Sequence, residues 1–242
     1  MNKSIIVPVF NEENNILNLI KKIEENIEPE DEIIIIDDGS IDGTFDEIKN
    51  ISHKIIKHEV NQGKGKAIIN GIKVARGELI ILIDGDGQDD PSEIFKLLKG
   101  IDEGFDFVIG SRFVEDDEKK IKRFTKTALS TINWFGNKSL TIMINLLFNL
   151  DIKDSQSGFK CIKTNEIKKL NLISPRYEIE TEIIIKSKRN GLKILEVPVH
   201  RYERKHGISN LFDIPFGRLI FLLKVLKVIV YGFFFWTKNS KH

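Results

Sequence analysis

The first 110 residues alternate between short apolar runs and longer stretches with helical periodicity, and this alternation restricts the possible folds strongly. Glu32–Asp37 contains four consecutive isoleucines, which is typical of a strand buried on both faces of a sheet. The pattern predicts an α/β fold with an open, mostly parallel sheet covered by helices. The strands are expected at Ser4–Phe10, Glu32–Asp37, Lys54–Glu59, Leu79–Asp84 and Phe107–Gly110, and the helices at Glu12–Asn26, Gly43–Asn50, Lys64–Arg76 and Pro91–Glu103.

The second half of the chain is organised differently. Arg123–Leu150 is long and apolar, and its Ser and Asn residues recur at spacings that predict one polar stripe along a helix. After the apolar segment Gly158–Ile162, a helix is expected over Glu178–Asn190 and a strand over Lys193–Val199. We expect residues 1–210 to form one domain and residues 211–242 to form an apolar and basic C-terminal appendage.

Composition excludes several classes of protein. The 242 residues are 41% hydrophobic, so the chain can bury a sizeable core. Because the chain contains 37 Lys and Arg residues and 36 Asp and Glu residues, its charges nearly cancel, and nucleic-acid binding by bulk electrostatics is not expected. One cysteine and five scattered histidines exclude a disulfide framework and a Cys/His zinc module. The N-terminal residues do not form a signal peptide, which predicts a protein kept on the reducing, cytosolic side.

The strongest local motif follows the fourth predicted strand. Residues 84–91 read Asp-Gly-Asp-Gly-Gln-Asp-Asp-Pro, with four carboxylates that repel each other unless a cation or hydrogen-bond donors neutralise them. The glycines allow a tight turn that brings the carboxylates of Asp84 and Asp86 together. Oxygen ligands of this kind favour Mg²⁺ or Mn²⁺. The alternative is an acidic turn that caps the helix at Pro91, and Asp89 or Asp90 has this role in either case.

Other polar motifs also follow predicted strands, at the edge where open α/β sheets bind ligands. Asp37-Asp38-Gly39-Ser40 ends the second strand and offers a carboxylate to a base or ribose, although an Asp turn explains it equally well. Pro8–Glu13 ends the first strand, and helix capping is its simpler explanation. Asn61–Lys66 matches neither the P-loop nor the dinucleotide pattern, yet Lys64 at a helix start suits a phosphate. Arg112 follows the fifth strand.

In order and spacing these motifs resemble the family 2 glycosyltransferases with a GT-A fold. Later motifs look like the polyprenyl-phosphate branch of that family, which includes dolichyl-phosphate mannosyl- and glucosyltransferases. These later motifs are Asp154–Lys160, Glu178–Glu182, Glu196–Val199 and Arg204-x-x-Gly207-x-Ser209. The family pattern Gly-Lys-Ser-Lys around Ser209 is changed here, because Ile208 and Asn210 replace its two lysines.

The resemblance implies an inverting, metal-dependent transfer of a sugar from a UDP- or GDP-linked donor to a polyprenyl phosphate, with Mg²⁺ or Mn²⁺ as cofactor. It implies that Asp84, Asp86 and Gln88 hold the metal. The implied donor-binding residues are Pro8, Phe10, Glu12, Asp38, Lys64, Gly85, Gln88, Arg204 and Ser209. Arg112 and Arg123 would contact the acceptor phosphate, and Asp86, Arg112 and Asp154 would serve catalysis.

Alternatives remain at this stage. A hydroxyl acceptor on a glycan or glycolipid would need a general base, for which Asp154 or Glu180 is the candidate, whereas a phosphate acceptor is already ionised. A sugar-1-phosphate nucleotidyltransferase would require a glycine-rich, arginine-bearing loop after the first strand, and Pro8–Glu13 is not such a loop. A non-catalytic, membrane-bound nucleotide-sugar-binding protein is the third alternative.

Two apolar segments predict contact with a membrane surface: Phe124–Leu150 and Ile214–Trp236. As a helix the latter is about 35 Å long, enough to cross a bilayer. Its three cations, at positions 218, 224 and 227, would each cost about 2.5–3.5 kcal/mol near the bilayer centre, so we expect it to lie in the interface. The alternative is packing on the protein's own core or on a second copy in a homo-oligomer. The sequence thus predicts a peripheral protein on the cytoplasmic face of a membrane.

Overall fold

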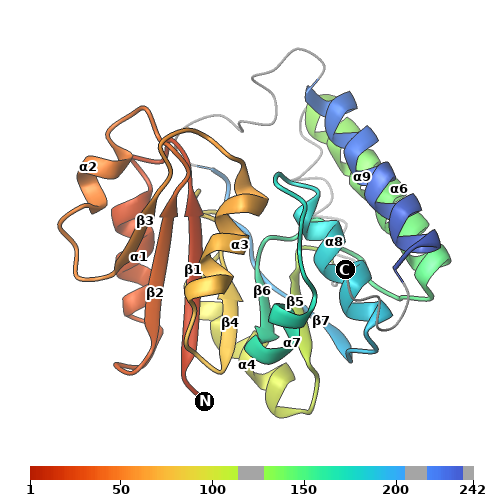
Figure 1. The fold of residues 1–242 in the computed structure, drawn as a ribbon, viewed down its shortest axis with the longest axis horizontal. Helices are drawn as coiled ribbons and strands as arrows, with labels where there is room; N and C mark the ends of the chain where they lie inside the picture. The colour runs from red at the N-terminus through yellow and green to blue at the C-terminus, as the bar shows by residue number, and fades with distance from the viewer. Residues whose placement is uncertain (114–127, 205–216, 237–242) are drawn as a thin grey trace.

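The computed structural model describes residues 1–113, 128–204 and 217–236, without side-chain detail at 128–133, 135 and 218 (Figure 1). A seven-stranded sheet forms the centre of the molecule, with strand order β3-β2-β1-β4-β6-β5-β7. The strands are β1 (Lys3–Val9), β2 (Glu32–Asp37), β3 (Lys54–Lys57), β4 (Leu79–Leu82), β5 (Phe107–Ser111), β6 (Lys160–Lys163) and β7 (Ile194–Pro198).

The sheet is mostly parallel, as the alternating pattern predicts. The pairs β1–β2, β1–β4, β2–β3 and β5–β7 are parallel, whereas β6 runs antiparallel to both of its neighbours. Strand β6 inserts between β4 and β5, which pushes the end of β5 sideways from the ends of β1, β2 and β4. The carboxyl edge of the sheet is therefore divided into two neighbouring polar regions.

Helices cover both faces of this sheet (Figure 1). The four helices expected before residue 110 are present, and the last of them begins with the 3-10 turn η1 (Pro91–Glu93) because Pro91 occupies its first position. Helix α7 follows β6 directly and was not expected from the sequence. The helices are α1 (Ile16–Glu24), α2 (Thr44–Ile48), α3 (Lys64–Val74), α4 (Ile94–Asp102), α6 (Ala128–Phe148), α7 (Thr164–Lys169), α8 (Ile179–Arg189) and α9 (Gly217–Phe234).

The isoleucine run of β2 is buried on both faces, as predicted. Ile34 and Ile36 join the core beneath α3, α6, α8 and α9, while Ile33 and Ile35 join the core beneath α1 and α4. All four side chains are at most 1% exposed. Alternation of side chains across the strand thus fills two separate apolar cores from one short segment.

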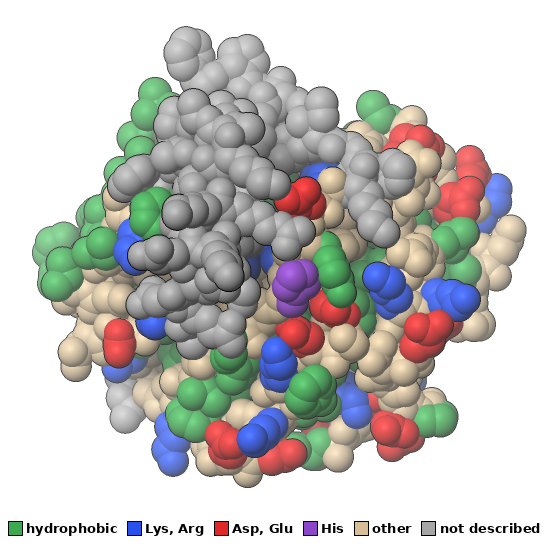
Figure 2. Space-filling model, turned by 180° about the vertical axis from the view of Figure 1, so that it is seen from behind, with side chains coloured by type: hydrophobic (Ala, Val, Ile, Leu, Met, Phe, Trp, Pro, Cys, Tyr) green, Lys and Arg blue, Asp and Glu red, His purple; other side chains and the backbone are tan. Residues whose placement is uncertain are grey.

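Helices α6 and α9 lie side by side against α8 at one end of the sheet (Figure 1). The inner face of α9 buries Val225 and Ile229, and Gly232 brings the helix so close that a Cβ there would lie 2.8 Å from Ile185 Cγ2. The outer faces of both helices expose large apolar side chains, including Leu146, Leu223 and Phe234. Figure 2 shows green side chains gathered at the left edge, where this helix pair lies after the turn of the view.

Packing on the protein's own core, the alternative expected for the C-terminal segment, describes its inner face, whereas contact with a membrane stays a prediction. One face packs on the protein's own core, and the other is apolar and exposed. Within the described ranges, none of the helices combines the length and the apolar character needed to traverse a bilayer. The expected boundary between residues 210 and 211 lies outside the described residues.

Candidate active site

The first polar region lies beyond the carboxyl ends of β1, β2 and β4, where Glu12, Asp38 and Asp84 come together with the start of α3. Asp38 is buried, and its carboxylate accepts hydrogen bonds from the backbone N–H of Gln62 (2.9 Å) and Gly63 (2.7 Å). It also contacts His58 Nδ1 at 2.7 Å. Asp38 therefore fixes the loop that leads into α3, and its contact with a base or ribose stays a prediction.

His58 is a member of this region that sequence reasoning missed. Its other ring nitrogen, Nε2, contacts Asn70 Nδ2 of α3 at 2.9 Å, so the imidazole joins the end of β2 to that helix.

Asp37, which precedes Asp38 in the sequence, accepts a hydrogen bond from Ser40 N (2.9 Å) through one oxygen. The other oxygen of Asp37 is buried without a hydrogen-bond partner in the described part of the chain.

Lys64 joins the first aspartate of the motif to helix α8. Its Nζ lies 2.6 Å from Asp84 Oδ1 and 2.6 Å from Glu180 Oε1. The second oxygen of Glu180 contacts Lys160, a fully buried lysine of β6. Burial opposes the charged form of Lys64, but the two carboxylates outweigh burial and raise the pKa of its ammonium group. Burial likewise opposes ionisation of Asp84, yet Lys64, Arg201 and Lys160 together outweigh burial and lower the pKa of this carboxyl.

Two glycines make room for this arrangement. A Cβ on Gly158 would lie 2.5 Å from Asp84 Oδ1, so no other residue fits beside that carboxylate. A Cβ on Gly85 would lie 2.5 Å from Val9 Cγ1 and 2.9 Å from the carbonyl oxygen of Pro8. Close approach of the backbone explains both glycines, and it places the end of β1 directly against the aspartate loop.

The aspartate loop, which we define as residues 84–90, is paired with residues 201–202. Tyr202 N donates to the carbonyl of Gln88 (2.7 Å), and Gln88 Nε2 donates to the carbonyl of Tyr202 (3.1 Å). Arg201 donates to Gln88 Oε1 (3.0 Å) and lies 3.5 Å from Asp86 Oδ2. Nearby, Arg204 forms an ion pair with Glu12, whose other oxygen accepts from Asn15 Nδ2 at 2.7 Å. Sequence reasoning singled out Arg204 but not Arg201.

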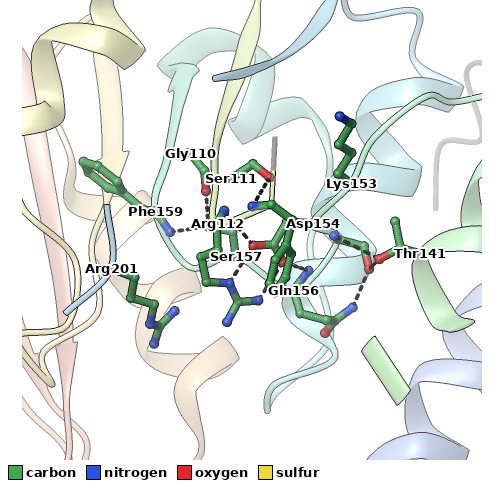
Figure 3. A network of polar contacts seen from close by, with 12 residues as sticks. Gly110, Ser111, Arg112, Thr141, Lys153, Asp154, Gln156, Ser157, Phe159 and Arg201 are labelled. Atoms are coloured by element: carbon green, nitrogen blue, oxygen red, sulfur yellow. Dashed lines mark hydrogen bonds and ion pairs between the residues drawn. The ribbon is translucent and has the colours of Figure 1, made fainter. Parts of the chain in front are cut away.

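The second polar region lies at the end of β5 (Figure 3). The Arg112 guanidinium donates two hydrogen bonds of 2.6 Å, one to each carboxylate oxygen of Asp154. Glu196 of β7 accepts the backbone N–H groups of Lys153 and Asp154, each at 2.7 Å. Burial alone would raise the pKa of Asp154, but the charge and hydrogen bonds of Arg112 outweigh burial and lower it. Asp154 is therefore an ionised carboxylate with both oxygens engaged.

Around this pair, hydrogen bonds connect helix α6, residues 155–156 and helix α8; Figure 3 labels Thr141 and Gln156. Thr141 of α6 contacts Ser155 at 2.8 Å between hydroxyl oxygens, and Gln156 Nε2 donates to Thr181 of α8 at 2.9 Å. A small pocket opens beside Asp154, lined by Phe113, Trp134, Asn137, Lys138, Thr141, Lys153 and Asp154. Asp154 thus lines a pocket that α6 closes on one side.

The donor atoms fit a divalent metal only in part. No group of three or more His, Cys, Asp or Glu residues able to enclose a metal ion occurs in residues 1–113, 128–204 and 217–236. Asp86 accepts from Gln88 N (3.1 Å) through one oxygen, and within the described residues its other oxygen has only the longer Arg201 contact. Mg²⁺ and similar ions are commonly held by one or two carboxylates together with water and substrate phosphate. The oxygens of Asp84, Asp86 and Gln88 therefore suit a metal shared with a phosphate ligand.

Some of the expected residues cannot be placed, and others contribute mainly through their position. Arg123 and Ser209 lie outside the described residues. Phe10 is half-buried just after β1, where Asn11 N donates to Ser40 Oγ (3.0 Å). Pro8, Phe10, Glu12, Asp38, Lys64, Gly85, Gln88 and Arg204 all come from segments at the carboxyl edge of β1, β2 and β4 or from the segment that crosses it. Their individual roles stay predictions.

Comparison with known proteins agrees with this geometry. The family model described as glycosyl transferase family 2 matches residues 4–164. The UDP-N-acetylglucosamine–dolichyl-phosphate N-acetylglucosaminyltransferase of Methanococcus voltae is 32% identical, over 93% of this chain and 97% of its own length. The dolichol-phosphate mannosyltransferase of Pyrococcus furiosus is 31% identical over 87% of this chain, which spans 59% of that protein.

A solved structure shows the same fold. Glucosyl-3-phosphoglycerate synthase from Mycobacterium tuberculosis, in complex with Mn²⁺, uridine diphosphate and phosphoglyceric acid, superposes with a TM-score of 0.71 at 21% identity. The match covers 99% of this chain and 80% of that chain. The GT-A architecture expected from the motifs is confirmed. From its family match, its relatives and its fold, the chain belongs to glycosyl transferase family 2 and is a glycosyltransferase.

Proposed function

We propose that this enzyme transfers a sugar, with inversion, from a UDP- or GDP-linked donor to a polyprenyl phosphate, with the help of Mg²⁺ or Mn²⁺. The observation that carries the proposal is the state of Asp154 and Glu180, the two carboxylates nominated as general bases. Asp154 has both oxygens on Arg112, and Glu180 lies between Lys64 and Lys160. Both carboxylates are thus engaged by cations.

A general base needs a pKa near the working pH and an oxygen that can reach the acceptor proton. Because Arg112 lowers the pKa of Asp154, this carboxylate is a poor proton acceptor near pH 7. A phosphate monoester is already ionised there and attacks without losing a proton. The geometry therefore favours a phosphate nucleophile over a hydroxyl one. The names of the relatives from M. voltae and P. furiosus, which both act on dolichyl or dolichol phosphate, support the same choice.

On the donor side, the leaving group is a nucleoside diphosphate whose negative charge grows as the sugar–oxygen bond breaks. A bound Mg²⁺ or Mn²⁺ would stabilise this charge as a Lewis acid. Asp84, Asp86 and Gln88 would hold that ion, and Lys64 would add a positive charge at the start of α3. Support for the metal and the diphosphate comes from the solved complex with Mn²⁺ and uridine diphosphate.

On the acceptor side, Arg112 would orient the attacking phosphate at the pocket beside Asp154. The exposed apolar faces of α6 and α9 would rest on the cytoplasmic surface of a membrane, so that the polyprenyl chain need not leave the lipid. Lys224 and Lys227 of α9 suit contact with anionic headgroups. Peripheral attachment is thus part of the proposed function.

The decisive experiment compares two acceptors that differ in one group. The full chain is incubated with Mn²⁺ and a panel of UDP- and GDP-sugars, and with either a short polyprenyl phosphate or the matching polyprenol. We expect transfer to the phosphate and none to the alcohol, and the productive donor identifies both base and sugar. Transfer to the polyprenol or to a glycan hydroxyl at a similar rate would contradict the proposal.

A further inference from the structure

Arg201 lies at the centre of the aspartate loop, although no sequence motif pointed to it. Its guanidinium is 3.5 Å from Asp86 Oδ2 and 3.9 Å from Asp89 Oδ1, and it donates to Gln88 Oε1 at 3.0 Å. The side chain of Arg201 is 12% exposed and that of Asp89 is 2% exposed. A cation is therefore built into the position next to the carboxylate best suited to a metal.

The backbone holds Arg201 in this position. Asp89 and Arg201 form an isolated antiparallel bridge. Beside it, the Tyr202 backbone N–H donates to the carbonyl of Gln88, and the Gln88 side-chain amide donates to the carbonyl of Tyr202. The hydroxyl of Tyr202 also donates to Asp90 Oδ2 at 2.7 Å. Because these contacts fix residues 201 and 202 against the aspartate loop, Arg201 is anchored there.

The local charges explain what such a cation does. Asp84, Asp86 and Asp89 carry three negative charges, and Lys64 and Arg201 supply two positive charges at contact distance. Glu180 does not alter this balance because Lys160 neutralises it. Among these described side chains one net negative charge remains, which attracts a divalent cation only weakly, and the guanidinium repels that cation. A bound diphosphate would add at least two negative charges and reverse the balance.

We propose that Arg201 is a built-in counter-cation that keeps the affinity of the free enzyme for divalent metal low and makes metal binding depend on the diphosphate of the donor. Asp89 acts as the positioning residue that holds Arg201 beside Asp86. The inference rests on the proposed function in one respect, namely that the donor carries a diphosphate. Arg201 also prevents the three carboxylates from repelling one another while the site holds no donor.

The test is direct binding of Mn²⁺ to the full chain, measured by electron paramagnetic resonance of free Mn²⁺ or by calorimetry. Wild type, Arg201→Gln and Arg76→Gln are compared without nucleotide. Arg76 is exposed and pairs only loosely with Glu32, so its variant is a control for the loss of one positive charge. We expect the Kd for Mn²⁺ to fall at least about tenfold in Arg201→Gln and to stay unchanged in Arg76→Gln. An Arg201→Gln variant with the wild-type Kd would overturn the proposal.

A second measurement keeps the proposal testable if Arg201→Gln does not fold. In wild type, UDP or GDP should lower the Kd for Mn²⁺ at least about tenfold, and wild type that binds Mn²⁺ equally well without nucleotide would contradict the proposal. Arg201→Lys, which retains the charge, should bind Mn²⁺ as weakly as wild type does. None of these measurements requires sugar transfer, so an inactive protein with the expected Mn²⁺ pattern would count against the proposed reaction alone.

Discussion

Arg112 and Asp154 are 42 positions apart in the chain, yet they form two parallel hydrogen bonds of 2.6 Å in a largely buried setting. The Arg112 backbone N–H adds a third contact to Asp154 Oδ2 at 3.2 Å. The fork of the guanidinium matches the carboxylate, so the pair connects the end of β5 to the loop before β6. This pairing lowers the pKa of Asp154 and keeps its carboxylate ionised.

Replacement of one partner should destabilise the fold, because it leaves an uncompensated charge in a buried site. We expect Asp154→Asn to lower the free energy of unfolding by about 3–5 kcal/mol. Replacement of both partners by apolar residues of similar size, as in Arg112→Met with Asp154→Leu, should cost less than this. Urea denaturation followed by circular dichroism measures both. Equal stability of Asp154→Asn and wild type would show that the pair contributes nothing.

The same pair predicts a pH dependence. The folded pKa of Asp154 is lowered, so its stabilising effect is present above the unfolded pKa of about 3.9 and is lost as the pH falls through the folded value. The difference in stability between wild type and Asp154→Asn should therefore be constant from about pH 5 to 8 and shrink below about pH 4. Unfolding curves at several pH values test this. A difference that shrinks near neutral pH would mean that Asp154 is protonated there.

Asp86→Asn should abolish most of the transfer while the fold remains intact. Asp86 is half-buried, and in the part of the chain that the structure describes its only ion pair is the 3.5 Å contact with Arg201, so we expect little stability to depend on it. Loss of a ligand charge at the diphosphate should reduce kcat by orders of magnitude in Mg²⁺ or Mn²⁺. Near wild-type turnover in either metal would remove the aspartate loop from the mechanism.

Asp38→Ala should act mainly on donor binding. The carboxylate lies far along the sheet edge from Asp154 and fixes the Gln62–Gly63 loop, so its loss should raise KM for the nucleotide sugar more than it lowers kcat. Asp38→Asn can still accept one of these hydrogen bonds and should show a smaller rise. Steady-state kinetics separates the two constants, and a collapsed kcat with unchanged KM would place Asp38 at the reaction centre.

Substitution of exposed apolar residues on the outer face of α9 by aspartate should weaken the binding of the enzyme to lipid and leave the fold intact. Leu223 and Phe234 are 57% and 66% exposed, so Leu223→Asp with Phe234→Asp removes apolar surface but no core contact. We expect weaker sedimentation with liposomes that contain anionic lipid, and unchanged donor hydrolysis. Phe95→Asp, an equally exposed site on α4, is the matched control. Undiminished sedimentation of the double variant would assign this face to another partner.

The point variants replace a cruder test, deletion of all residues after Asn210. Such a deletion should release the protein from liposomes and leave donor binding intact if the segment only contacts lipid. Because Val225 and Ile229 are fully buried against the rest of the protein, the deletion would also expose core. A loss of stability would then obscure the result, which is why exposed positions are preferred.

Local patterns were sufficient for the first 110 residues, because each strand and helix there carries its own periodicity. Strand β6 shows where local information ends. Nothing within Lys160–Lys163 indicates that it runs antiparallel between β4 and β5, since that pairing is set by distant residues. A lysine at its first position argues against a buried strand, and Lys160 is tolerated only because Glu180 neutralises it.

The candidate site divides in the same way. Asp84, Asp86 and Arg112 follow strand ends and were accessible from spacing alone. His58 and Arg201 were less accessible, because each is a single residue whose contact, with Asp38 and with Asp86 respectively, forms only when the chain folds. The proline, glycines and acids of a motif can be interpreted from the local backbone conformation that they favour. An ion pair between residues 42 or more positions apart depends on the tertiary fold.

Helix α8 has consequences for attempts to exchange parts between relatives. Its first turn carries Glu180, which holds Lys64 at the aspartate loop, and further along Ile185 and Lys186 contact Gly232 and Trp236. One short helix thus contacts both Lys64, beside the aspartate loop, and the C-terminal end of helix α9 with Trp236 just after it. A hybrid enzyme that takes α6 and α9 from a relative would need to take α8 as well, with a lysine that fits its glutamate. The elements that must be exchanged together are therefore α6, α8 and α9, which are neighbours in space although other elements separate them in the chain.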